Sequence, residues 1–134
     1  MTQAAIRQSL GNCKTIAVVG LSPKPHRDSF RVAKYMQDHG FRIVPINPNA
    51  QEVLSEKAYA SLSEAAQHER IDMVNCFRNS EDIPPIAAEA IAIGAKSLWL
   101  QLGVVNNVAA KQATDAGLVV VQNLCLMVEH RQLG

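Results

Sequence analysis

Short apolar runs alternate along the chain with longer segments in which apolar residues recur every three or four positions. The longer segments predict helices, and several end in a glycine that is followed at once by an apolar run. The short runs are continuously apolar and rich in β-branched residues, which is typical of strands covered on both faces. Such alternation with right-handed crossovers gives a parallel sheet. The pattern predicts one doubly wound α/β domain over residues 1–134, with about five strands in three layers, α/β/α.

The predicted elements can be placed by residue number. Strands are expected at residues 15–20, 42–46, 71–76, 97–100 and 118–121. Helices are expected at residues 3–12, 28–40, 80–94 and 107–117, with a final helical turn within residues 122–134. Residues 50–70 are less regular, although a capping-box sequence at residues 61–64 starts a short helix. Pro45 predicts an irregular end to the second strand, or a hydrogen bond left unmade there.

The loop after the first strand, residues 20–29, has the chemistry of an anion site. Gly20 ends the strand, and Asp28 or Ser29 opens the next helix. Three basic or potentially basic side chains lie between them: Lys24, His26 and Arg27. The free N–H groups and the dipole of a helix N-terminus favour a phosphate. The turn chemistry of glycine and proline explains the same residues without a ligand, so an anion site and a plain βα turn both stay open.

The same loop lacks the dinucleotide-binding fingerprint. Ser22 and Pro25 stand where that fingerprint needs glycines, and neither Pro23 nor Pro25 has an N–H for a phosphate. Asn47 and Pro48 follow the second strand, where a nicotinamide cofactor normally meets an acidic residue. A nucleotide-binding protein of the NAD type is therefore a disfavoured alternative.

The other strand ends complete the expected site, because ligands of such sheets bind at the C-terminal ends of the strands. The segments there are polar and small: residues 20–27, 47–49, 77–80, 101–107 and 122–125. Arg78 joins Lys24 and Arg27 as a cation for phosphate, since arginine is a good bidentate phosphate partner. Before the family is considered, simple packing is the favoured explanation of four residues near these ends: Cys76, Phe77, Trp99 and Cys125.

Composition argues against several classes of binding partner. Of the 134 residues, 48% are hydrophobic and 4% aromatic, and the formal net charge is +1, which argues against a nucleic-acid or membrane surface. No run approaches transmembrane length, and the N-terminus lacks the apolar core of a signal peptide. The three cysteines have no CxxC spacing and fit a reducing cytoplasm. The histidines have no neighbours at ligand spacing, so no metal site is expected.

Five segments at the strand ends can be read together: Gly-Leu-Ser-Pro-Lys-Pro at 20–25 with Arg27 and Ser29, Pro-Ile-Asn-Pro at 45–48, Cys-Phe-Arg at 76–78, Trp-Leu-Gln-Leu-Gly-Val at 99–104, and Cys-Leu-Met-Val-Glu-His at 125–130. In this order they resemble the loops of the small bacterial CoA-binding-domain proteins. These look like a free-standing version of the N-terminal CoA-binding domain of succinyl-CoA synthetase α-subunits. The resemblance covers roughly residues 10–131 and implies a Rossmann-like fold.

The resemblance implies coenzyme A, or an acyl-CoA, as the ligand. It implies that the phosphates are held by residues of the first loop: Gly20, Ser22, Pro23, Arg27 and Ser29. Asn47 and Pro48 would flank the nucleotide, and Phe77 and Arg78 would border the adenosine end. The remaining residues would follow the pantetheine arm to the far side of the pocket: Gln101, Leu102, Gly103 and Cys125.

Several positions depart from the family's usual residues. His26 and Asn75 replace acidic residues, Asn123 and Leu124 replace Asp-Arg, and Met127 replaces a frequent lysine. These changes remove charge around the far end of the pocket. The synthetase reaction also needs a phosphohistidine in a second domain, so the expectation is a binding module without ligase activity. An enzyme or redox protein that uses Cys125 with bound CoA stays open, as does a homodimer or a partner protein.

Overall fold

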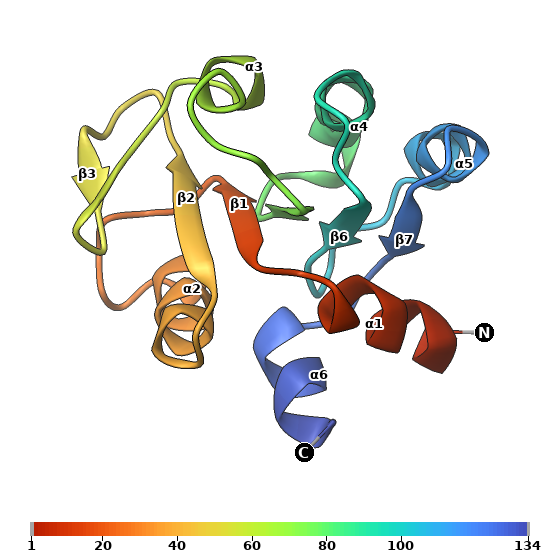
Figure 1. The fold of residues 1–134 in the computed structure, drawn as a ribbon, viewed down its shortest axis with the longest axis horizontal. Helices are drawn as coiled ribbons and strands as arrows, with labels where there is room; N and C mark the ends of the chain where they lie inside the picture. Colours follow the sequence, from red (N-terminus) through yellow and green to blue (C-terminus); the bar gives the residue numbers. More distant parts are fainter. Residues whose placement is uncertain (1, 134) are drawn as a thin grey trace.

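A five-stranded parallel sheet forms the centre of the computed structural model, which describes residues 2–133 (Figure 1). Its strands, in chain order, are β1 (Thr15–Val19), β2 (Arg42–Ile46), β5 (Met73–Cys76), β6 (Ser97–Leu100) and β7 (Val119–Val121). Their spatial order is β2-β1-β5-β6-β7, and every neighbouring pair is parallel. The winding of the chain therefore reverses between β1 and β5, and such a switch point is where doubly wound sheets bind ligands.

Helices cover both faces of the sheet (Figure 1). One face carries α1 (Thr2–Gly11), α2 (Asp28–Asp38) and α6 (Leu126–Gln132), and the other carries α3 (Leu62–Ala65), α4 (Ile83–Ala92) and α5 (Asn107–Asp115). Side chains of β1 alternate between the two cores, with Ile16 and Val18 on the first face and Ala17 and Val19 on the second. The predicted three-layer, Rossmann-like α/β fold is thus confirmed. None of the helices in residues 2–133 has the length and apolar character needed to cross a membrane.

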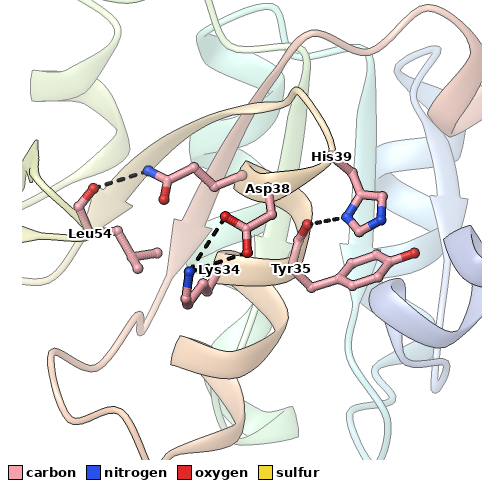
Figure 2. A network of polar contacts seen from close by, with 6 residues as sticks. Lys34, Tyr35, Asp38, His39 and Leu54 are labelled. Atoms are coloured by element: carbon pink, nitrogen blue, oxygen red, sulfur yellow. Dashed lines mark hydrogen bonds and ion pairs between the residues drawn. The ribbon is translucent and has the colours of Figure 1, made fainter.

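The expected irregular segment contains an antiparallel hairpin that the sequence did not reveal. Its strands are β3 (Glu52–Val53) and β4 (Glu56–Lys57), and Leu54 and Ser55 between them both have positive φ, 56° and 63°. Two consecutive residues with positive φ form the tight turn that hairpins favour. This turn usually contains glycine or asparagine, and Leu-Ser therefore gave no sign of it in the sequence. α2 holds this hairpin, because the side-chain amide of Gln37 donates to the carbonyl of Leu54, 3.0 Å away; Figure 2 shows Leu54 beside α2.

The structure decides between the two alternatives predicted at Pro45. β2 runs in regular register through Pro45, which pairs with Val18, so the irregular end is excluded and the hydrogen bond that proline cannot donate is the one left unmade. The Pro45 carbonyl points away from β1 and accepts from the N–H of Tyr59 (3.0 Å), and the N–H that proline lacks would face the same outer side. The expected final turn is a seven-residue helix, α6, and it packs against α2. The fold therefore gains a wall next to the strand ends.

Candidate functional site

A groove of about 540 Å³ lies at the C-terminal edge of the sheet, beside the switch point. Its walls are the first turns of α2, the segments that follow β5 and β6, and the start of α6. The lining residues are Asp28, Arg31, Val32, Phe77, Arg78, Asn79, Gln101, Leu102, Val104, Cys125, Met127 and Val128. Phe77, Arg78, Gln101, Leu102 and Cys125 were expected from the sequence, and the structure brings these five residues together in one groove.

Gly20 lets the β1–α2 loop approach this groove. Its φ is +85°, in the left-handed region that L side chains rarely adopt. A Cβ at this position would overlap the carbonyl oxygen of Phe77 and lie 3.3 Å from Cδ of Arg78. Glycine is therefore needed here both for its backbone conformation and for the close approach of two groove residues.

Two serines fix the shape of the β1–α2 loop. The Oγ of buried Ser29 accepts from the N–H of Ser22 (3.0 Å), and the Oγ of Ser22 accepts from the N–H of Lys24 (3.1 Å). Pro23, Lys24 and Arg27 are exposed. Both serine oxygens are thus engaged with the loop itself, and the cationic side chains face solvent beside the first turn of α2.

Asn47 connects the loop after β2 to the loop after β1. Its Nδ2 donates to the carbonyl of Leu21 (2.9 Å), and its Oδ1 accepts from the N–H of Asn49 (2.8 Å). Both polar atoms of the side chain have internal partners, and Pro48 is exposed. Asn47 therefore joins the two loops through its side chain, next to an exposed proline.

A network of amides lies under the floor of the groove. Nδ2 of Asn75, which is 1% exposed, donates to the carbonyl of Trp99 (3.4 Å) and to Oε1 of Gln101 (3.3 Å). That Oε1 also accepts from the N–H of Leu126 (3.3 Å). Backbone groups therefore fix the orientation of both side-chain amides. Oδ1 of Asn75 is buried without a partner among the described residues.

The loops after β6 and β7 support the far end of the groove. The N–H of exposed Gly103 donates to Oδ1 of Asn123 (2.7 Å), which has a φ of 61°. The indole N–H of Trp99 donates to the carbonyl of Leu124 (2.8 Å). Leu102, which precedes Gly103 in the same loop, lines the groove, and its side chain is 67% exposed. Two residues that depart from the family's usual ones thus make contacts here. Asn123 holds the neighbouring loop through its side chain, and Leu124 does so through its backbone carbonyl.

Comparison with known proteins identifies the family. The family model for the CoA binding domain matches residues 14–131. The chain belongs to the CoA-binding domain family. It is 43% identical over 129 residues to the uncharacterized protein YneT of Bacillus subtilis, covering 96% of this chain and 94% of that protein.

Two more distant comparisons place this CoA-binding domain among solved and curated proteins. A hypothetical protein from Pyrococcus horikoshii has the same structure with a TM-score of 0.93 and 40% identity, covering 100% of this chain and 94% of that one. An ADP-forming acetate–CoA ligase of Archaeoglobus fulgidus is 29% identical over 85 residues, which span 62% of this chain and 12% of the ligase. The resemblance seen in the sequence is confirmed.

Some residues that line the groove of this CoA-binding domain were missed by the sequence reasoning. Arg31 lies one helical turn after Arg27 on α2 and pairs with Asp28. The four-residue spacing from Arg27 places both arginines on one side of the start of α2, and this spacing could have predicted Arg31 as a groove residue. Val128 was missed as a lining residue because only one helical turn was expected there, whereas Met127 was expected near the far end of the pocket. Arg78, by contrast, was expected, and it pairs with Asp82 at 3.3 Å.

The three thiols of the CoA-binding domain have different surroundings. Full burial raises the pKa of Cys76 to about 12. Burial, and then the nearby Asp72 carboxylate, raise the pKa of Cys13 to about 12 as well. Cys13 lines a separate cavity at the opposite, N-terminal edge of the sheet. Cys125 is half-buried and lines the groove, directly before α6.

Proposed function

We propose that this chain binds coenzyme A or an acyl-CoA in the groove, as a binding module without catalysis of its own. The observation that carries the proposal is the meeting of two surfaces at the switch point. A groove with an apolar far wall opens beside a loop in which Lys24 and Arg27 have no ion-pair partner among residues 2–133. A ligand with a polyanionic end and an uncharged arm matches this arrangement.

The ligand is proposed to lie across the strand ends in one direction. Its phosphates lie against the β1–α2 loop, where Gly20, Ser22, Pro23, Lys24, Arg27 and Ser29 are found. Its nucleotide lies between Asn47-Pro48 and Phe77-Arg78. Its pantetheine arm passes Gln101, Leu102 and Gly103 and ends near Cys125. Arginine favours this placement because its guanidinium holds phosphate oxygens in pairs.

The module is proposed to be a single domain over residues 1–134. The ADP-forming ligase is far longer than the segment that matches, so its reaction belongs to that protein and is not proposed here. A reducing compartment such as the cytoplasm is proposed as its location, because the described cysteines Cys13, Cys76 and Cys125 are free thiols. Its partner is proposed to be the small CoA ligand itself.

The proposal is tested by thermal unfolding with a panel of ligands at equal excess: CoA, acetyl-CoA, a long-chain acyl-CoA, NAD and ATP. A ligand at 100 times its dissociation constant stabilises the folded state by about 2.7 kcal/mol, which raises the melting temperature by several degrees. We expect a shift with the CoA species alone. A shift with NAD or ATP and none with CoA would contradict the proposal and favour a different nucleotide.

A further inference from the structure

The amide of Gln101 presents a hydrogen-bond donor to the groove. Gln101 is 6% exposed, and its Oε1 is held by two donors, Nδ2 of Asn75 and the N–H of Leu126. Because the backbone N–H requires an oxygen at that position, the Nε2 must be on the other side. Among residues 2–133 this Nε2 has no hydrogen-bond partner, and Gln101 lines the groove. This Nε2 is not shut off from solvent, so a ligand acceptor, such as an amide carbonyl, can replace water as its partner.

This donor lies next to the groove thiol. The N–H that holds Gln101 belongs to Leu126, and the preceding residue is Cys125. Cys125 occupies the N-cap position of α6, where its side chain makes no capping hydrogen bond. A ligand arm that accepts from Gln101 therefore passes close to the sulfur of Cys125. Met127 and Val128 line the same part of the groove.

The surroundings of the thiols favour one of them for exchange. Only a thiolate attacks a disulfide, and exchange also needs access to the sulfur. Cys76 is fully buried, and Cys13 is held as a thiol by burial and by Asp72. Among the described cysteines, Cys125 alone lines the groove. A disulfide that enters the groove can therefore contact the sulfur of Cys125, and of no other described cysteine.

We propose that Cys125 captures the ligand covalently, as a mixed disulfide with the thiol of coenzyme A. The inference rests on the proposed function, because the groove must first bind CoA. The co-reactant is a disulfide of CoA. The Cys125 thiolate attacks the sulfur of the CoA moiety bound in the groove, and a new S–S bond forms. The old S–S bond breaks, and the second CoA leaves as a thiolate and takes up a proton. Cys125 is oxidised as that leaving CoA is reduced, and a thiol reductant reverses the step.

The bound state would then depend on the redox state of the CoA pool. With reduced CoA the groove exchanges its ligand freely. With CoA disulfide the groove retains one CoA covalently until a reductant releases it. A binding module with this chemistry acts as a reversible store, or as a sensor, of oxidised CoA.

The test uses the whole protein, Cys125→Ser and the matched control Cys13→Ser, which alters another half-buried thiol at the opposite edge of the sheet. Each is incubated with CoA disulfide or with glutathione disulfide, and intact mass is followed over time without reductant. We expect one CoA adduct in the wild type and in Cys13→Ser, released by dithiothreitol, and no adduct in Cys125→Ser. Binding before exchange should make the reaction with CoA disulfide at least about tenfold faster than that with glutathione disulfide.

The contrary outcomes separate the two proposals. An adduct that persists in Cys125→Ser, or equal rates with the two disulfides, would overturn the inference. A thermal shift with reduced CoA but no adduct with CoA disulfide would contradict the covalent step alone. Neither a shift nor an adduct would contradict CoA binding, and the covalent inference with it.

Discussion

Asn75 and Gln101 hold each other's side-chain amides in a single orientation, with Nδ2 of Asn75 lying 3.3 Å from Oε1 of Gln101. The two residues come from the adjacent strand ends of β5 and β6. The carbonyl of Trp99 fixes the first amide and the N–H of Leu126 fixes the second. The pair therefore determines which atom of Gln101 faces the groove.

Gln101→Glu tests this relationship. The variant keeps an oxygen for the N–H of Leu126 and for Asn75 but removes the Nε2 donor. We expect CoA to bind about tenfold more weakly, because one hydrogen bond contributes roughly 0.5–1.5 kcal/mol and the new carboxylate faces the ligand's acceptor. Isothermal titration measures the loss. Gln122→Glu is the matched control: its side chain bonds Asn106 and Asn107 outside the groove, and its CoA affinity should not change.

Gly20→Ala should destabilise the fold and damage the site together. The left-handed backbone alone costs an alanine roughly 1–2 kcal/mol, and the overlap with the Phe77 carbonyl adds to that cost. Gly40→Ala is the control, since Gly40 has a φ of +94° and open space around its missing Cβ. Urea unfolding should show a larger loss of unfolding free energy for Gly20→Ala. Equal losses would mean that the contact with Phe77 is easily relaxed.

Arg27→Ala should weaken CoA binding without altering the fold. Arg27 is exposed, and a hydrogen bond to a charged group contributes about 1.5–3 kcal/mol, or tenfold or more in affinity. Arg70→Ala removes an equally exposed arginine at the opposite edge of the sheet and serves as the control. Titrations at low and high salt should show a smaller salt dependence for Arg27→Ala than for the wild type. Unchanged CoA affinity in Arg27→Ala would show that the CoA phosphates do not lie against this part of the loop.

The surroundings of His130 should make the stability of the fold depend on pH. Nδ1 of His130 on α6 lies 2.9 Å from the hydroxyl of Tyr35 on α2, and the ring of His39 lies edge-on to it, 5.4 Å between centroids. Figure 2 shows that Tyr35 and His39 come from the end of α2, where Nδ1 of His39 lies 2.7 Å from the Tyr35 carbonyl. Burial, and then the proximity of His39, lower the pKa of His130 below its ordinary value of 6.5.

The sign of the effect follows from that direction. Between the lowered pKa and 6.5 the unfolded chain binds the His130 proton and the folded chain does not, so this histidine makes unfolding easier as pH falls through that window. His130→Gln should therefore lose less stability than the wild type between pH 7.5 and 5.5. Melting temperatures across that range measure the difference. An unchanged slope in His130→Gln would contradict the prediction.

Local patterns predicted much of the fold. Strands such as β1 and β6 are continuously apolar because helices cover both their faces, and this shows directly in the sequence. The β3–β4 hairpin was missed because Leu54 and Ser55 adopt positive φ without the residues that usually announce such a turn. The length of α6 was underestimated because contacts with α2, such as that between His130 and Tyr35, stabilise it.

The location of the candidate site was predictable, but the direction of its polar groups was not. Parallel strands bring their C-terminal ends to one edge, so Phe77 and Gln101 had to lie near each other. The sequence cannot show that both amide atoms of Asn47 are used internally, or that Leu126 turns the Nε2 of Gln101 towards the groove. These facts depend on backbone groups supplied from far along the chain.

The groove receives its last wall from α6, which follows all the other groove elements in chain order. The β1–α2 loop and the ends of β5 and β6 leave the ribosome well before α6, which brings Cys125, Met127 and Val128. A nascent chain can therefore form the part of the groove beside the β1–α2 loop while its far end is still open to water. Only a chain that extends through α6 presents a complete groove, so capture of a groove ligand distinguishes molecules that include α6 from fragments that end before it.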